Sequence, residues 1–153
     1  MEYWGKNRNK NRGYQKLRVW RDAVDYYVSS SKVYSKFTYH LKRIASQAIV
    51  SSDSIHGNIA EGYCRKSIRE YLQFLNIALG SLGESVSGNI AYKKAEQITD
   101  EDYEKLDALA YKLENGLLKL VESLEHKRNH GDWVDSLTEK ERDDVYSYES
   151  GMK

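Results

Sequence analysis

Apolar residues recur at intervals of three and four along four stretches of the chain, a spacing typical of helices that bury one face. The first three stretches cover about residues 17–36, 39–62 and 67–94, and the fourth begins after Thr99 and ends near residues 126–128. The fourth has the most regular stripe, which comprises Tyr103, Leu106, Ala110, Leu113, Leu117, Leu120, Val121 and Leu124. The chain contains no proline, the strongest helix breaker. Four amphipathic helices with short links predict an all-α fold, a mostly antiparallel four-helix bundle.

Local signals predict where these helices begin and end. Ser67 and Glu70 have the spacing of a capping box, in which the serine accepts a bond from the backbone three residues later. Thr99 and Asp102 have the same spacing, so a second helix should begin there. Gly62 is expected to close the second helix, because glycine enters the left-handed conformation without steric cost.

The third predicted helix carries Gly80, Gly83 and Gly88 along its length. A glycine inside a helix costs about 1 kcal/mol relative to alanine. We expect another helix to approach closely at these positions, because close packing would compensate for that cost. The chain also has 13 tyrosines and only two phenylalanines, and tyrosine suits half-buried faces and interfaces.

The two ends of the chain carry opposite charge. Residues 1–18 have six basic residues and one acidic residue (net +5), and residues 132–149 have seven acidic and two basic residues (net −5). We therefore predict a flexible, disordered basic arm over residues 1–15, the bundle over 16–128, and an acidic tail with a short helix over 129–153. These ends either bind other molecules or are simply solvated.

Basic residues form the clearest candidate binding site. They lie in the arm, at the start of the second helix, at the turn into the third helix and near the end of the third helix: Lys6, Arg8, Lys10, Arg12, Lys42, Arg43, Arg65, Lys66, Arg69, Lys93 and Lys94. Such residues bind a phosphate backbone through charge and counterion release, without sequence preference. The alternative is a surface that serves only solubility.

Signals of catalysis and metal binding are weak. The histidines His40, His56, His126 and His130 do not combine with Cys64 in a metal-ligand spacing. His126 and His130 are four residues apart, but no carboxylate motif accompanies them. The chain has no phosphate-binding glycine loop and no nucleophile elbow. We therefore expect a protein that is not an enzyme and needs no metal or cofactor.

The cellular location is predicted from what the chain lacks. A single cysteine cannot form an intramolecular disulfide, which fits a reducing compartment. No apolar stretch approaches the roughly 20 residues of a membrane-spanning helix. The polar, basic N-terminus has no apolar run behind it, unlike a secretory signal. We expect a cytoplasmic protein without a membrane partner.

The middle of the chain resembles a known family. The residues concerned are Asn58-Ile-Ala-Glu-Gly62, Arg65-Lys-Ser67, Glu70, Phe74-Leu75, Ile77-Ala-Leu-Gly-Ser-Leu82 and Glu84, together with Leu17, Val19-Trp20, Ala23, Val33-Tyr34 and Gln47. They resemble the bacterial four-helix-bundle proteins often encoded in 23S rRNA intervening sequences, over roughly residues 16–125. Two positions depart from the family pattern: Ser54-Ile-His-Gly57 stands where Ser-Ile-Pro-Ser is usual, and Ile49-Val50 where two arginines are usual.

That family is similar in fold to the accessory variability determinant proteins of diversity-generating retroelements. The resemblance implies a non-enzymatic homo-oligomer, with a pentamer favoured, that binds a reverse transcriptase and RNA or an RNA/DNA hybrid. The alternative is a structural or interaction protein of the intervening-sequence type with no direct nucleic-acid role.

Six residues are expected to act structurally: Asn58, Glu61, Gly62, Ser67, Glu70 and Gly80. Asn58 and Glu61 form a polar pair near the end of an apolar helix. We predict that they join a buried hydrogen-bond network that fixes the register of the bundle or of its subunits. The alternative for this pair is direct contact with a ligand.

Overall fold

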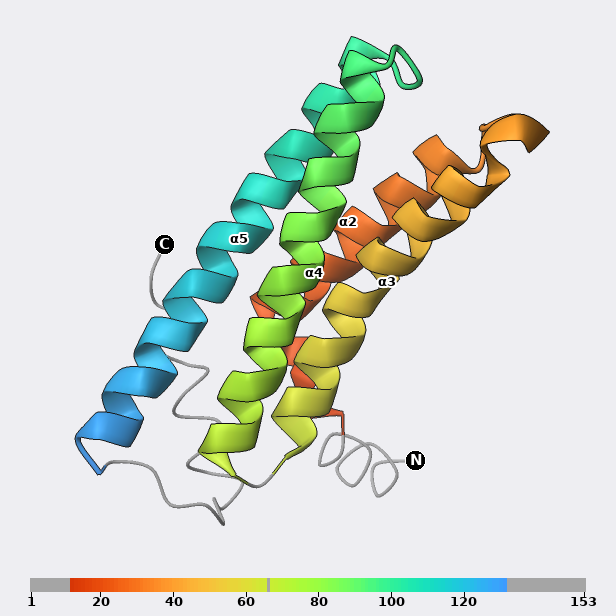
Figure 1. Ribbon diagram of the computed structural model, residues 1–153. Helices are drawn as coiled ribbons and strands as arrows, with labels where there is room; N and C mark the ends of the chain where they lie inside the picture. Colours follow the sequence, from red (N-terminus) through yellow and green to blue (C-terminus); the bar gives the residue numbers. More distant parts are fainter. Residues whose placement is uncertain (1–11, 66, 132–153) are drawn as a thin grey trace, which may run out of the picture.

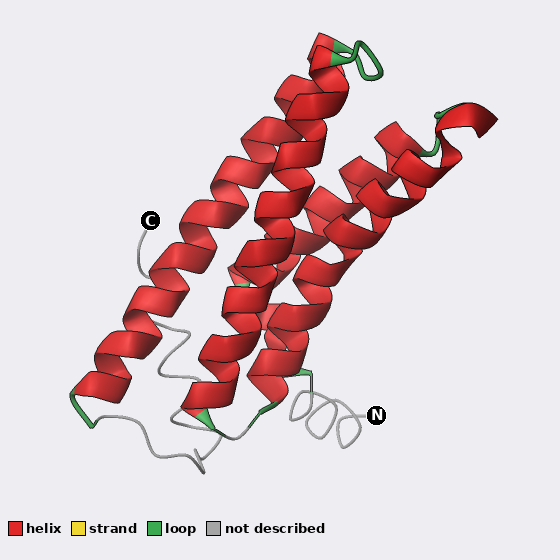
Figure 2. Ribbon diagram, viewed as in Figure 1, coloured by secondary structure: helices red, strands yellow, loops and turns green. Residues whose placement is uncertain are grey.

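The computed structural model describes residues 12–65 and 67–131, and Figure 1 shows the arrangement of their helices. Two 3₁₀ turns, η1 (Gly13–Lys16) and η2 (Tyr39–Leu41), accompany four α-helices. The α-helices are α2 (Arg18–Tyr34), α3 (Lys42–Cys64), α4 (Ile68–Lys94) and α5 (Asp100–Asn129). The described residues contain no strand (Figure 2). The prediction of an all-α chain with four main helices is therefore confirmed.

The four helices form a ring of neighbours. α2 packs against α3 and α5, and α4 packs against the same two helices, so each helix has two neighbours that run in the opposite direction. Figure 1 shows the α2–α3 hairpin and the α4–α5 hairpin diverging toward the end that carries residues 35–41 and 95–99. We call this the open end. The closed end carries η1, the α3–α4 junction and the last turn of α5.

The core follows the predicted stripes most closely in α5. Large side chains from all four helices are fully buried: Leu17, Tyr26, Tyr34, Ile55, Ile59, Leu75, Leu82, Leu106, Leu113, Leu117, Leu120 and Leu124. In α4 the buried residues include the polar Ser85 and Asn89 besides Leu72, Leu75 and Leu82, and the apolar Ile90 is 40% exposed. The reason is that α4 carries apolar residues on more than one side, so spacing alone does not select its inner face.

Both predicted capping residues act as N-caps. The Ser67 hydroxyl accepts a bond from the Glu70 amide at 3.4 Å, and the Thr99 hydroxyl accepts from the Asp102 amide at 3.1 Å. The Glu70 carboxylate lies 3.8 Å from the Arg65 guanidinium, so this acid faces the α3–α4 junction. Each cap satisfies a backbone donor that a helix start leaves unpaired.

Gly62 was predicted to close α3, but the helix continues to Cys64. A Cβ atom at this position would lie 2.9 Å from the Cβ of Phe74 and 2.9 Å from the ring of Tyr71. Glycine is therefore needed here for the close approach of α3 and α4, and not for a left-handed backbone.

Residues 1–15 were predicted to be disordered, but residues 13–15 belong to the 3₁₀ turn η1. η1 begins at Gly13, which is buried, and the Tyr14 ring lies 5.3 Å from Trp20 and 6.2 Å from Tyr63. A Cβ at Gly13 would lie 2.1 Å from the Tyr63 hydroxyl, so this glycine allows η1 to rest on α3. An aromatic contact thus fixes where the arm leaves the bundle. The rest of the arm, and the tail over residues 132–153, lie outside the described residues.

Candidate binding surfaces

A hydrogen-bond network lies between α2 and α4, across the middle of the bundle. The Tyr26 hydroxyl lies 2.7 Å from the Ser85 hydroxyl and accepts a bond from the Asn89 side-chain amide at 2.9 Å. The Tyr34 hydroxyl donates to the Asn89 side-chain oxygen. All four side chains are buried. The network therefore fixes the register of α2 against α4, because the partners meet in only one alignment of the two helices.

Burial changes the acidity of the two tyrosines. It raises the pKa of the Tyr26 phenol above its ordinary value, although the hydrogen bonds with Ser85 and Asn89 oppose the shift. It also raises the pKa of Tyr34, and the neighbouring phenols of Tyr26 and Tyr92 add to this effect. Both phenols therefore stay protonated to a higher pH than an exposed tyrosine does.

Within the chain, Asn58 and Glu61 do not form the predicted buried network. The Asn58 amide donates to the Ser54 carbonyl at 2.8 Å and to the Ser54 hydroxyl at 2.9 Å, all within α3. Ser54 in turn lies 3.0 Å from the Ser81 hydroxyl of α4. The Glu61 side chain is 51% exposed and pairs with Arg65. Glu61 lies on the solvent side of α3, where a carboxylate keeps its hydration.

Arg65 is engaged by several groups at the α3–α4 junction. Its guanidinium lies 2.8 Å from the Glu61 carboxylate and 3.8 Å from that of Glu70. It also lies over the Phe74 ring at 4.9 Å from the centroid. Arg65 therefore has two carboxylate partners and an aromatic contact within the chain, so a phosphate would compete with these groups for it.

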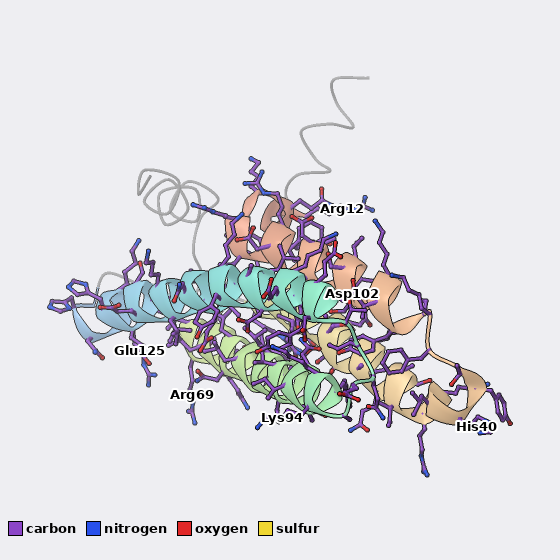
Figure 3. The ribbon with its side chains drawn as sticks, turned by 90° about the horizontal axis from the view of Figure 1, so that it is seen from above. Arg12, His40, Arg69, Lys94, Asp102 and Glu125 are labelled. Atoms are coloured by element: carbon purple, nitrogen blue, oxygen red, sulfur yellow. The ribbon has the colours of Figure 1, made fainter. Side chains whose placement is uncertain are left out.

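The other predicted basic residues are divided between the two ends of the bundle. Lys42, Arg43, Lys93 and Lys94 lie at the open end, and Arg69 lies at the closed end. Figure 3 labels Arg69 and Lys94. α4 has 27 residues, so Arg69 and Lys94 are separated by nearly its full length of about 40 Å. The structure thus does not gather them into one patch. Lys6, Arg8, Lys10 and Lys66 lie outside the described residues.

Sequence reasoning missed two basic residues at the closed end, Lys127 and Arg128, which lie in the last turn of α5. Arg12, a predicted site residue, begins the described chain at this end. The aromatic contacts of Tyr14 place the exit of the arm at the same end. The antiparallel order of the helices could have placed the last turn of α5 at the closed end, although the start of α2 packs against the middle of α5, where a Cβ at Gly116 would lie 2.9 Å from Val19.

The outward side of α4 is almost free of charge. Between Leu72 and Tyr92, nine residues are exposed, and only Glu84 among them is charged. The nine are Gln73, Asn76, Ile77, Gly80, Gly83, Glu84, Ser87, Ile90 and Ala91, and we call them the α4 outer face. In α5, by contrast, eight of the twelve exposed residues between Asp100 and His126 are charged.

Gly80 and Gly83 lie on the α4 outer face, so the close helix contact predicted for them does not occur among residues 12–65 and 67–131. A Cβ atom at either position would have no neighbour within 4 Å. At Gly88 the three atoms nearest to an added Cβ all belong to Tyr92 of the same helix. Ile77 is 45% exposed on the same face. Uncharged, partly apolar surfaces of this kind mark contacts with other molecules.

The candidate chemical groups are scattered among the described residues. The rings of His126 and His130 stack with centroids 4.0 Å apart, and Cys64 is exposed. Within residues 12–65 and 67–131, no group of three or more His, Cys, Asp or Glu side chains is placed to hold a metal ion. In the same part of the chain, every helix lacks the combination of length and apolarity needed to cross a membrane.

The fold and its surfaces define a small helical-bundle protein with an uncharged flank. The family model described as 23S rRNA-intervening sequence protein matches residues 15–119, and the chain belongs to this family. Its fold is similar to the crystal structure of a protein with unknown function from the S23 ribosomal protein family of Bacteroides thetaiotaomicron VPI-5482. The TM-score is 0.65 at 23% identity, covering 70% of this chain and 97% of that chain. A comparison with curated proteins finds no match.

Proposed function

We propose that this protein is a non-enzymatic accessory protein that assembles into a homo-oligomer and binds RNA or an RNA/DNA hybrid together with a reverse transcriptase. The α4 outer face supports assembly, because nine exposed residues with a single charge are unusual for a helix that faces only water. Open space at Gly80 and Gly83 leaves room for a second helix to approach closely. A pentamer and a reverse transcriptase partner rest on the resemblance to accessory variability determinant proteins.

Nucleic-acid binding is supported by the position of the arm. Arg12 marks its exit at the closed end, where Lys127 and Arg128 also lie. Lys6, Arg8 and Lys10 precede it along the chain with no acidic residue between them. In a homo-oligomer several arms can bind the same nucleic acid. Once one arm is bound, the others are held close to it, and this high effective concentration strengthens the overall binding.

The arm is tested by changing Lys6, Arg8, Lys10 and Arg12 to alanine in the full chain. Binding to a fluorescent single-stranded RNA is measured by anisotropy over a series of salt concentrations. The slope of log affinity against log salt should fall by about three, because each lost phosphate contact contributes about 0.7. A control variant with Lys32, Lys105 and Lys119 changed to alanine should keep the wild-type slope. An unchanged slope in the arm variant would exclude this role.

A second candidate function is interaction with proteins alone, of the intervening-sequence type. The engagement of Arg65 by Glu61 and Glu70 favours it, as does the position of Lys93 over the Tyr103 ring at 4.3 Å. In this case the protein assembles but does not shift RNA on a gel at moderate salt. Purified reverse transcriptase offered to the same assembled protein then tests the protein partner separately.

A further inference from the structure

A notch with an apolar floor lies at the open end, between the tips of the two hairpins. Val33, Phe37 and Leu41 line it from the α2–α3 side, and Ile98, Thr99 and Asp102 line it from the α4–α5 side. Its volume is about 260 Å³. The Lys36 ammonium and the Asp102 carboxylate lie 3.9 Å apart at its rim. The notch thus offers apolar surface for a ring and a carboxylate that can accept a bond from a hydroxyl.

Tyr39 is the most exposed large apolar side chain among the described residues, at 83%. Thr38 and Leu41, on either side of it along the chain, both line the notch, but Tyr39 itself does not. One exposed aromatic residue is ordinary on a protein surface. Tyr39 is distinguished by its position, because it protrudes beside a notch with the volume and chemistry to receive a side chain of its own type.

The two tips carry opposite charge. Residues 35–43 contain Lys36, Lys42 and Arg43 and no acidic residue. Residues 95–104 contain five acidic residues and no basic one: Glu96, Asp100, Glu101, Asp102 and Glu104. Both tips project from the same end of the bundle and diverge from each other (Figure 1). Figure 3 places His40 of the basic tip away from Asp102 of the acidic tip.

We propose that the open ends of two copies dock on each other, with Tyr39 of each copy inserted into the notch of the other. The two copies are related by a two-fold axis. This axis is perpendicular to the long axis of the bundle and also to the line from the basic tip to the acidic tip. The rotation therefore places the basic tip of each copy opposite the acidic tip of the other. Lys42 and Arg43 then face Asp100 and Glu101 of the other copy. Such a contact is isologous and closed, so it joins two copies and no more.

The contact is independent of the α4 outer face, which runs along the side of the bundle. The tips are small, so the buried area falls in the class of weak interfaces, below about 1,200 Å² in total. Opposite charges at an exposed contact are screened by salt. The docked pair should therefore form at high protein concentration and low salt, and should separate when the salt concentration rises.

Light scattering of the full chain over a concentration series tests this contact. At about 50 mM salt the mass should double at high concentration, and at about 500 mM the doubling should disappear, because the Debye length shortens. Tyr39→Ala should weaken the association by about tenfold or more, as expected for a buried aromatic anchor. The doubling is measured relative to the mass of the assembly that forms through the α4 outer face, or of the monomer if that assembly does not form. Failure of that assembly and failure of this contact are therefore read separately.

Charge reversal provides the decisive arm of the experiment. One variant carries Lys42→Glu and Arg43→Glu, and the other carries Asp100→Lys and Glu101→Lys. Neither variant alone should double in mass, because residues 42–43 and 100–101 then carry charge of the same sign. An equal mixture should double, because the acidic residues of one variant then meet the basic residues of the other at these positions. Circular dichroism confirms that both variants fold, and Lys119→Glu on the side of α5 serves as a charge control. Absence of doubling in the wild type, or doubling that persists in Tyr39→Ala and in each reversed variant, would overturn the proposal.

Discussion

Two glycines in α3 should respond in opposite ways to the same substitution. At Gly62 an added Cβ would lie 2.9 Å from Phe74 and 3.2 Å from the Tyr71 carbonyl oxygen, whereas at Gly57 nothing lies within 4 Å. Gly62→Ala should therefore lower the free energy of unfolding by about 1–3 kcal/mol through overpacking. Gly57→Ala should raise it by about 1 kcal/mol through helix propensity. Urea unfolding measures both, and effects of the same sign would contradict the packing at Gly62.

The buried tyrosines predict that the protein loses stability at alkaline pH. An ordinary tyrosine has a pKa of 10.0, and the pKa values of Tyr26 and Tyr34 are raised in the folded chain. Above pH 10 the unfolded chain releases protons that the folded chain keeps, so unfolding becomes more favourable as pH rises. This contribution is complete below pH 10 and is lost as pH rises toward the folded-state values.

Urea unfolding between neutral pH and pH 11 measures that loss. The variant with Tyr26→Phe and Tyr34→Phe is the control, because it retains the rings and removes the two ionisable groups. Its stability should fall less steeply above pH 10 than that of the wild type. Equal slopes would mean that the two phenols ionise as readily in the folded chain as in the unfolded one.

Local chemistry explains which residues the sequence could predict. The caps at Ser67 and Thr99 each involve a bond between residues three apart, so a short motif suffices to find them. The bonds of Tyr26 to Ser85 and Asn89 join residues 59 and 63 positions apart. Only the assembled bundle, in which α2 lies diagonally across from α4, brings these groups together. A serine and an asparagine four residues apart in an apolar helix were nevertheless a signal.

At the scale of the helix, α4 and α5 differ on their outward sides, and only α5 has the charges of an ordinary surface helix. The alternation of apolar and charged residues predicted the inner face of α5 correctly. α4 has apolar or small residues on both sides, so its pattern left the inner face undetermined. The three glycines of α4 predicted a close contact with another helix, and the described residues do not show one. Two of them, Gly80 and Gly83, have no neighbour within 4 Å of an added Cβ among the described residues.

Gly80→Lys with Gly83→Lys tests the role of this face. The monomer has room for both side chains. Helix propensity should make the fold more stable by about 1 kcal/mol or more. The same change should abolish assembly through the α4 outer face, because two charges would have to be desolvated in the contact. Sedimentation and thermal unfolding measure the two effects. Lysines that leave the assembly intact would show that the face is not an interface.

At the scale of the whole molecule, the separation of surfaces is the result that sequence could not provide. The described candidate basic residues lie at opposite ends of the bundle, and the α4 outer face runs along its side. The sequence alone does not tell whether Lys42, Arg65 and Lys93 form one nucleic-acid surface. Their relative positions depend on the order and the length of the helices. The bundle itself was predictable, because four amphipathic stripes with short links leave few other ways to bury their apolar faces.

The network between α2 and α4 has a consequence for building chimeras from related proteins. Aliphatic contacts tolerate an exchange of one hairpin for another of similar shape, whereas Tyr26 and Tyr34 require hydrogen-bonding partners at the positions of Ser85 and Asn89. A donor hairpin with apolar residues at those two positions would leave buried hydroxyls without partners. A hairpin of this protein can therefore be exchanged for that of a relative only if the relative has hydrogen-bonding side chains at all four of these positions.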